Sequence, residues 1–260
     1  MSKIRDAFDN KKAFIAYLMA GDPNLDASAR YILTAQDAGA DMVEIGIPFS
    51  DPIAEGEVIQ AASARALDAG TRLDGVFNMV ASIKDKMRIP LVFMSYLNPL
   101  FVFGYERFFD RCAEIGICGV IIPDLPFEEQ GEVKSASGRH GVEVEIVTLA
   151  SPTSEKRITQ IAGNAEGFIY LVSSLGVTGV RNEITSDLSA IVAEIKKATN
   201  IPVAIGFGIS TPEQAERFSS IADGVIVGSA IVRIIGQYGE NAERALIDYI
   251  SEMKRAVAVS

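Results

Sequence analysis

Apolar residues gather in eight short runs along the chain, separated by helix-length stretches of mixed polar and apolar residues. Most of these runs are apolar at consecutive positions, which is typical of parallel strands covered on both faces. Regular alternation of such strands with helices favours a parallel sheet with crossover helices. The expected strands span residues 14–19, 42–47, 91–94, 120–122, 142–148, 168–172, 203–205 and 224–227.

Eight strand–helix units in 260 residues suit a closed barrel better than an open doubly wound sheet. We therefore predict a single α/β domain over residues 1–260, a (β/α)8 TIM barrel. Gly39 and Gly116 lie where helices should end, as left-handed C-terminal glycines do. Ser210-Thr211-Pro212-Glu213 combines a capping hydroxyl, a proline at the first helical position and a glutamate three residues on, which predicts a helix start.

The longest polar loops follow the second and sixth expected strands, at residues 48–57 and 173–187. Barrel enzymes carry their chemistry on the loops that follow the strands. We therefore expect the functional residues at that end of the barrel.

Composition narrows the classes of function. A net charge of −10 argues against a nucleic-acid or anionic-membrane surface, because both need clustered cations. No apolar run is long enough to span a bilayer and the N-terminus does not resemble a signal peptide, so we expect a cytoplasmic protein. Cys112 and Cys118 give neither a disulfide framework nor a zinc pattern, and His140 is the only histidine. We expect no metal site, and acid–base chemistry must fall on carboxylates, tyrosine or lysine.

Two glutamates belong to the second strand and its loop. Glu44 interrupts a buried apolar run, where an unpaired charge is costly. It is either a carboxylate satisfied by local donors or a general acid–base group whose pKa is raised by its apolar setting. Glu55 lies in the following loop and is either solvated or a second functional carboxylate.

Glycine-bearing turns follow the last three expected strands, at residues 176–179, 206–210 and 228–232. Each alone is compatible with an ordinary turn. Together, with a short helix beginning near Ser229, they favour a phosphate site made of backbone N–H groups. Six residues at strand ends either pack in the barrel or line an apolar pocket, namely Tyr17, Met94, Tyr96, Ile121, Tyr170 and Phe207. A pocket that is aromatic on one side and binds phosphate on the other suggests an aryl sugar phosphate.

These segments resemble the tryptophan synthase α-subunit family over essentially the whole chain. The resemblance rests on Ala20-Gly21-Asp22-Pro23, Glu44-Ile45-Gly46-Ile47-Pro48-Phe49-Ser50-Asp51-Pro52, Pro123-Asp124-Leu125-Pro126 and the three glycine-bearing turns. It implies a barrel with an extra N-terminal helix, here residues 4–10. It also implies cofactor-free cleavage of indole-3-glycerol phosphate to indole and glyceraldehyde 3-phosphate. The indole would pass to a β subunit that carries pyridoxal phosphate, in an α2β2 complex.

The resemblance also implies roles for particular residues. Glu44 matches the acid–base glutamate of the family, and Glu55 stands where the family typically has an aspartate that binds the indole N–H. Residues 173–187 would form a lid, with Thr178 facing the loop after the second strand. The remaining matches are phosphate-binding Gly179, Gly208, Gly228 and Ser229, substrate-lining Tyr170 and Phe207, and β-subunit contacts Pro48, Asp51, Asn98 and Pro126.

Two departures from the family pattern lie in the same loop. Glu55 replaces the aspartate, and Glu57 replaces a proline. The added methylene shifts a carboxylate by about 1.5 Å, so we expect the loop to compensate for the longer arm. Two alternatives remain open: a free-standing indole-3-glycerol-phosphate lyase, and a catalytically weak chain that acts mainly as an allosteric cap on the β subunit.

Overall fold

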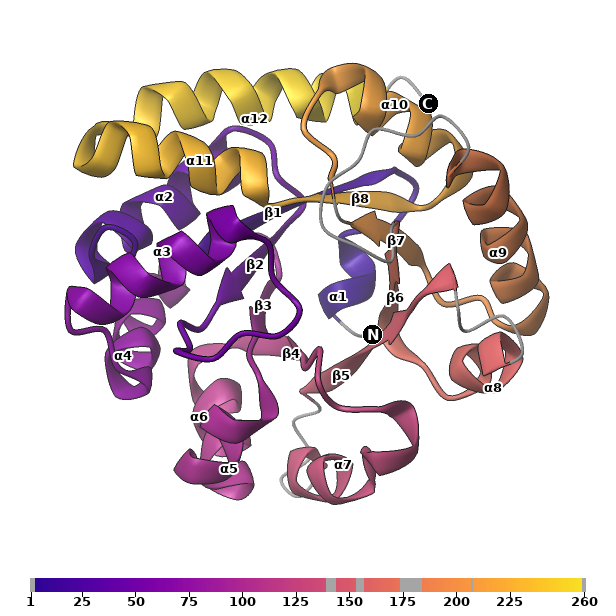
Figure 1. Ribbon diagram of the computed structural model, residues 1–260, viewed down its shortest axis with the longest axis horizontal. Coiled ribbons are helices and arrows are strands. Elements are labelled where there is room, and N and C mark those ends of the chain that lie inside the picture. The colour runs from indigo at the N-terminus through magenta and orange to yellow at the C-terminus, as the bar shows by residue number, and fades with distance from the viewer. Residues whose placement is uncertain (1–2, 139–143, 153–156, 174–183, 207, 259–260) are drawn as a thin grey trace.

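Eight parallel strands close into a barrel in sequence order, as the sequence predicts. The computed structural model describes residues 3–138, 144–152, 157–173, 184–206 and 208–258. Figure 1 looks into the barrel, with the helices arranged around it. The strands are Ala13–Met19 (β1), Met42–Gly46 (β2), Leu91–Met94 (β3), Ile117–Ile121 (β4), Glu145–Ala150 (β5), Glu166–Val172 (β6), Val203–Gly206 (β7) and Gly224–Val227 (β8).

Helices cover the outside of this barrel and follow the strands in turn (Figure 1). The α-helices in the described part of the chain are Lys3–Asp6 (α1), Leu25–Asp37 (α2), Glu57–Asp68 (α3), Leu73–Ile83 (α4), Leu97–Phe103 (α5), Tyr105–Ile115 (α6), Gly131–Ser137 (α7), Ile158–Gly163 (α8), Ile184–Ala198 (α9), Pro212–Ile221 (α10), Ser229–Tyr238 (α11) and Glu243–Ala258 (α12). Short 3-10 helices span Lys84–Lys86 (η1), Phe127–Glu129 (η2) and Gly239–Asn241 (η4).

Helix ends follow the expected chemistry with one change of residues. Gly39 and Gly116 have φ angles of 103° and 80°, a left-handed conformation that glycine adopts without strain. At the start of α10 the capping residue is Thr211, and its partner in the capping box is Gln214. The predicted pair of Ser210 and Glu213 is therefore displaced by one residue, because Pro212 takes the first helical position.

Four strands begin at residues other than those predicted. β1 and β6 start one and two residues early, at Ala13 and Glu166, and β4 and β5 are each displaced by three residues. β4 starts at Ile117 and includes Gly119. A β-carbon at Gly119 would lie 2.7 Å from Cδ1 of Ile4, so glycine at this strand position leaves room for the Ile4 side chain. β5 starts at Glu145, whose carboxylate accepts a hydrogen bond from the Gly167 N–H at 3.1 Å. A carboxylate with a backbone donor is stable at a strand start, which an apolar pattern alone does not reveal. Residues 142 and 143, part of the same prediction, lie outside the described residues.

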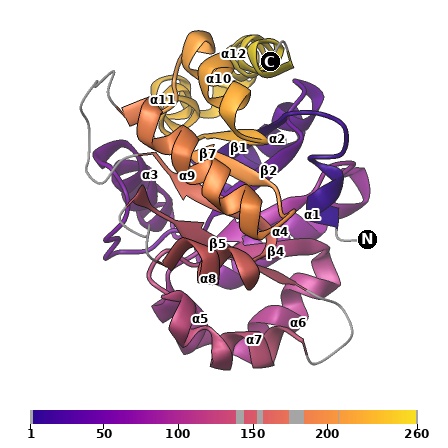
Figure 2. The same cartoon turned by 90° about the vertical axis from the view of Figure 1, so that its right-hand side faces the viewer.

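The extra N-terminal helix is present and shorter than predicted. α1 spans Lys3–Asp6 rather than residues 4–10, and Asn10 has a φ of 56° that is incompatible with continuing a right-handed helix. Ile4 is fully buried and contacts the interior side of β4 and β6 at Gly119 and Gly167. Figure 2 shows α1 at one end of the barrel, where it closes the interior.

Buried side chains form two main layers. An inner cluster fills the barrel and includes Ile15, Met42, Val92, Phe168 and Ile226. An outer cluster lies between the strands and the helices, and residues of alternate strand positions such as Val43 and Ile45 belong to it. This alternation means that Glu44, between Val43 and Ile45, points inward with Met42.

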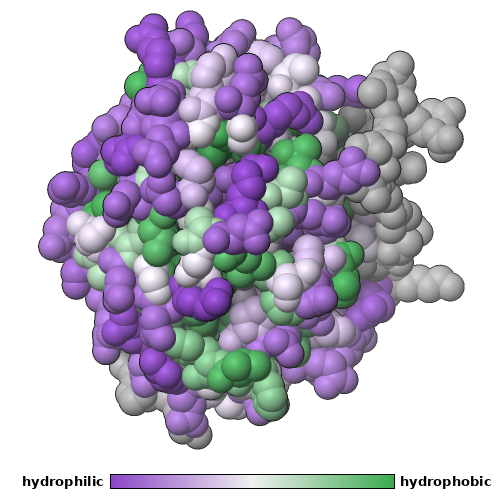
Figure 3. Space-filling view, turned by 60° about the vertical axis from the view of Figure 1, so that its left-hand side comes forward, coloured by the Kyte–Doolittle hydropathy of each residue, from purple (hydrophilic) through white to green (hydrophobic). Residues whose placement is uncertain are grey.

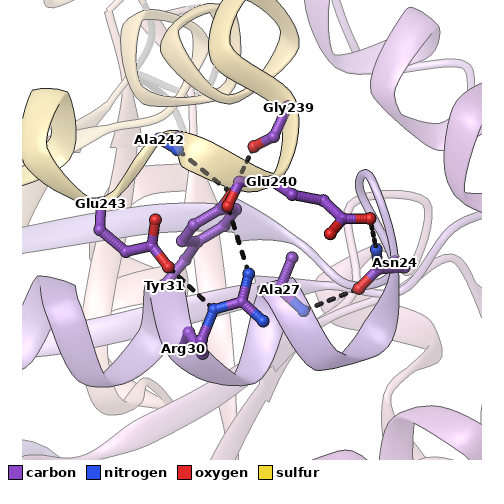
Figure 4. Close-up of polar contacts among 8 residues, drawn as sticks. All are labelled: Asn24, Ala27, Arg30, Tyr31, Gly239, Glu240, Ala242 and Glu243. Carbon is purple, nitrogen blue, oxygen red and sulfur yellow. Dashed lines mark hydrogen bonds and ion pairs between the residues drawn. The ribbon is translucent and has the colours of Figure 1, made fainter.

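Polar contacts join the first helix of the outer layer to the last (Figure 4). The Tyr31 hydroxyl donates to the Gly239 carbonyl and accepts from the Ala242 N–H. Arg30 bonds to Glu243 at 2.8 Å. Asn24 caps α2 and also donates to Glu240 at 2.8 Å. These bonds hold η4 and the start of α12 against α2, so the two ends of the helical layer meet.

Candidate active site

Glu44 enters the barrel interior from β2. Its register partner on β1 is Tyr17, so the two inward-facing side chains are neighbours. The Glu44 side chain is 1% exposed, and neither carboxylate oxygen has a hydrogen-bond partner among the described residues. An unpartnered buried carboxylate is costly in its charged form. Of the two interpretations of Glu44, a carboxylate satisfied by local donors does not agree with the structure, because the described residues give it no donor.

Glu55 lies in the loop between β2 and α3, and side chains on both sides hold its backbone. The Tyr96 hydroxyl accepts the Ala54 N–H at 3.0 Å, and the Gln60 amide donates to the Glu55 carbonyl at 2.7 Å. Glu57 is the first residue of α3, where a proline would also fit. Glu57, which replaces the family's proline, is thus part of helix α3 rather than of the loop. The loop itself is held by the hydrogen bonds at Ala54 and Glu55.

Both glutamates face one cavity at the ends of the strands. Its volume is about 530 Å³, including its open mouth. The carboxylates lie on one side and the turns after β7 and β8 on another, with tyrosines and aliphatic side chains between them. The lining residues are Tyr17, Glu44, Ala54, Glu55, Gly56, Ile59, Met94, Tyr170, Gly208, Ile209, Ile226, Gly228 and Ser229.

Burial changes the acidity of the groups around this cavity. It raises the pKa of Glu44 to about 8, with a further contribution from the charge of Glu55. Burial also raises the pKa of Glu55 to about 7. The pKa of Tyr17 is raised by burial and then by the charges of Glu55 and Glu44. The carboxylate pair therefore exchanges protons near neutral pH, while the phenol stays protonated.

The glycine-bearing turns opposite the carboxylates can receive an anion. Gly208 is exposed with a φ of 78°, and α11 begins at Ser229, as predicted, with Gly228 before it. The first N–H groups of a helix have no partners within the helix, and its dipole favours negative charge there. The cavity thus has two carboxyl groups that can exchange protons at one side and a helix start that can bind an anion at the other.

A family model described as tryptophan synthase alpha chain matches residues 4–258. The chain belongs to this family. The tryptophan synthase alpha chain of Lacticaseibacillus casei is 46% identical over 257 residues, which cover 99% of this chain and 96% of that protein. The corresponding protein of Lactiplantibacillus plantarum is 48% identical, with 99% and 97% covered.

Solved structures of tryptophan synthase share the fold. Subunit alpha from Legionella pneumophila superposes with a TM-score of 0.90 at 35% identity, covering 100% of both chains. A chain of tryptophan synthase from M. tuberculosis in an aminoacrylate-bound form gives a TM-score of 0.87 at 29% identity, covering 99% of this chain and 100% of that one. The predicted TIM barrel is confirmed on both counts, the strand order and these similarities.

Most residues predicted for the tryptophan synthase site do meet at the cavity, and two of them do not line it. Tyr96 is buried beside the cavity because its hydroxyl is engaged with the backbone at Ala54. Ile121 is fully buried in the inner cluster next to Met94, its register partner on β3. Phe207, Thr178, Gly179 and His140 lie outside the described residues, as does most of the predicted lid.

Several lining residues of the site were missed by the sequence interpretation. Ile226 lies two positions before Gly228 on β8, so strand alternation alone places it on the same face. Ile209 lies in a turn already selected for its glycines. Ile59 and the anchoring Gln60 occupy the first turns of α3, and no local pattern marks them as close to the barrel mouth.

The residues predicted to face a β subunit differ in exposure. Asp51, Asn98 and Pro126 are exposed, whereas Pro48 is buried. Pro48 and Asn98 line an open groove of about 840 Å³, a volume that includes solvent at its mouth. Large apolar side chains nearby are strongly exposed: Ile53 by 79%, Val102 by 76% and Phe101 by 66%. Figure 3 brings the side of α3 and α4 forward and shows apolar patches among hydrophilic residues. Exposed apolar patches commonly mark interaction surfaces.

Two features are absent from the described part of the chain. No group of three or more His, Cys, Asp or Glu side chains in that part of the chain is arranged to hold a metal ion. No helix there is both long and apolar enough to cross a membrane.

Proposed function

We propose that this chain cleaves indole-3-glycerol phosphate to indole and glyceraldehyde 3-phosphate. The observation that carries the proposal is the cavity with Glu44 and Glu55 at one side and the start of α11 at the other. In this proposal the indole ring lies between the tyrosines and aliphatic residues of the wall, and the phosphate lies at Gly208, Gly228 and Ser229. Gly179, Thr178 and Phe207 keep the roles that the family resemblance implies.

Glu44 carries the proton in this mechanism. In its neutral form it protonates indole C3, while ionised Glu55 accepts a hydrogen bond from the indole N–H and stabilises the positive charge on the ring. The Glu44 carboxylate then takes the proton of the glycerol hydroxyl next to the ring. The carbon–carbon bond breaks, and its electron pair returns to the indole. Glu44 ends protonated as it began, and no cofactor of this chain is consumed.

The proposal includes a β subunit as partner and an α2β2 complex. The support is the apolar side chains of Ile53, Phe101 and Val102 that are exposed beside the loop of Glu55 and on α5. Asp51, Asn98, Pro126 and groove-lining Pro48 belong to the same proposed surface. A cytoplasmic location and a single domain over residues 1–260 are also part of the proposal.

Steady-state cleavage of indole-3-glycerol phosphate, with and without a β subunit, tests this function. We expect slow release of indole by the chain alone and a marked increase when the β subunit is added. Full turnover without the β subunit would instead support a free-standing lyase. Activation of β-subunit chemistry by a chain that does not cleave the substrate would support an allosteric cap. Failure to produce indole under either condition would refute the proposed cleavage.

A further inference from the structure

Three buried polar atoms at the floor of the cavity have no hydrogen-bond partner among the described residues. They are the Tyr17 hydroxyl oxygen and both carboxylate oxygens of Glu44. Tyr17 and Glu44 are register partners on neighbouring strands, and both line the cavity. A buried polar group without a partner costs free energy, so its persistence requires a reason. The Tyr17 hydroxyl is a hydrogen-bond donor and the Glu44 carboxylate is an acceptor, yet the two groups do not bond to each other.

Two glycines fix the direction of the Tyr17 ring. A β-carbon at Gly228 would lie 3.3 Å from the Cβ end of this side chain, and one at Gly46 would lie 2.2 Å from its hydroxyl oxygen. The ring therefore extends from the turn that precedes α11 to the strand that carries Glu44. Its hydroxyl lies at the carboxylate end of the cavity, away from the proposed phosphate position.

We propose that the Tyr17 hydroxyl donates a hydrogen bond to the glycerol oxygen that becomes the aldehyde oxygen, while Glu44 takes the proton from that same oxygen. This inference rests on the proposed function. An alcohol oxygen both accepts and donates, so one substrate hydroxyl satisfies Tyr17 and Glu44 at once. The indole ring carbons offer neither contact, and the hydroxyl on the carbon bonded to indole C3 is the one that Glu44 deprotonates in the proposed mechanism.

The step balances without a net change at Tyr17. The hydroxyl proton of the substrate moves to the Glu44 carboxylate, and the bond between the glycerol carbon and indole C3 breaks. Its electron pair neutralises the positively charged indole, and the oxygen becomes a carbonyl. Tyr17 keeps its proton throughout and stabilises the negative charge that develops on the oxygen. Burial and the two glutamates raise the pKa of Tyr17, which keeps it a donor.

The floor of the cavity can adapt to a ligand at this point. Met94 lines the cavity and packs against the cluster that contains Tyr17. An unbranched methionine side chain changes rotamer more readily than the branched residues around it. The Tyr17 and Glu44 oxygens are shielded from solvent, so a substrate hydroxyl reaches them only when a lining side chain such as Met94 moves.

Replacing Tyr17 by phenylalanine tests the inference, because the ring is retained and only the hydroxyl is lost. We expect kcat for cleavage by the αβ complex to fall by about tenfold to a hundredfold, with KM changed less than about twofold. The Kd of indole-3-propanol phosphate, which lacks both glycerol hydroxyls, should stay within about twofold of wild type. Tm should be unchanged or higher, because an unpartnered buried hydroxyl is removed. Tyr238→Phe, at an exposed position on α11, is the matched control and should leave all four quantities unchanged.

Three results would overturn the inference. A Tyr17→Phe kcat within about twofold of wild type would show that the hydroxyl has no role in cleavage. Weaker binding of indole-3-propanol phosphate would place the hydroxyl at the indole N–H or the phosphate. A lower Tm with parallel losses in kcat and binding would indicate a structural role. If the wild-type complex itself releases no indole, the proposed function fails and this inference fails with it, whereas wild-type activity with any of the three results refutes this inference alone.

Discussion

The charge of Glu55 raises the pKa of Glu44, although the first lies in an anchored loop and the second on a barrel strand. The two carboxyls are therefore close enough, and sufficiently shielded from water, to titrate as a pair. Burial contributes more to the raised pKa of Glu44 than Glu55 does. Mutual repulsion favours the state in which one carboxyl is neutral and the other ionised, which is the state that the proposed mechanism requires.

The pH dependence of cleavage should be bell-shaped. The active pair has Glu55 ionised and Glu44 protonated, so kcat/KM should rise through the lower apparent pKa, about 7, and fall through the higher one, about 8. These apparent values belong to the pair rather than to either residue. Rates measured from about pH 5.5 to 9.5 would check this, and a rate that keeps increasing to the alkaline end would contradict the need for a neutral Glu44.

Ionisation of Glu44 should lower the free energy of unfolding at neutral and alkaline pH. Its pKa is about 8 in the folded chain and 4.5 in the reference state. Below about pH 4.5 both states hold the proton and there is no penalty. As pH rises towards 8 only the unfolded state releases it, so the free energy of unfolding falls, by on the order of 3 kcal/mol at pH 7.

Glu44→Gln should therefore have a higher Tm than wild type at pH 8 and a similar Tm at pH 4. Thermal unfolding at the two pH values measures this difference. Glu252→Gln, on an exposed part of α12, controls for the loss of one carboxylate. Equal Tm values for wild type and Glu44→Gln at pH 8 would mean that the Glu44 carboxylate finds a partner in solution.

Glu55→Gln should lose nearly all cleavage activity, because an amide cannot carry the charge that stabilises the protonated indole. Glu57→Gln is the matched control, since Glu57 is exposed at the first position of α3 and should retain wild-type rates. The measurement is kcat/KM in the presence of a β subunit. More than about a tenth of the wild-type rate in Glu55→Gln would exclude the assigned role.

Gly208→Ala should weaken both the fold and the proposed phosphate site. The φ of Gly208 is 78°, and a side chain in this conformation costs about 1 kcal/mol even though space around the position is open. We expect a lower Tm and a KM for indole-3-glycerol phosphate raised by about tenfold. Gly131→Ala on α7 also enters open space but without a positive φ, so it should neither lower Tm nor change KM. An unchanged KM in Gly208→Ala would remove this turn from the phosphate site.

The strands and the inward position of Glu44 are the parts that local sequence predicts well. β3 and β8 have the predicted bounds because their apolar runs end at polar or glycine residues. Glu44 stands out because a charge in such a run is costly, and its unpartnered oxygens bear this out. The start of β5 is different, because Glu145 is stabilised by a residue on another strand.

The loop and helix that position the site are held by contacts between residues that are far apart in the sequence. Tyr96 follows β3 and was expected to line the cavity, yet its hydroxyl accepts the N–H of Ala54, 42 residues earlier in the loop that carries Glu55. Arg65 on α3 bonds to buried Asp22 at 2.7 and 2.8 Å, which fixes the helix that follows this loop. No periodicity or motif specifies such pairs, since they arise only when the barrel brings the loops together.

The most direct test of the account compares wild type with Glu44→Gln in a single-turnover cleavage experiment. Saturating enzyme, in complex with a β subunit, is mixed with indole-3-glycerol phosphate at about pH 7.5, and indole is followed in time. We predict that Glu44→Gln binds indole-3-propanol phosphate as wild type does and releases indole at least about a thousandfold more slowly. Release at more than about a tenth of the wild-type rate, with binding intact, would contradict the central role of Glu44.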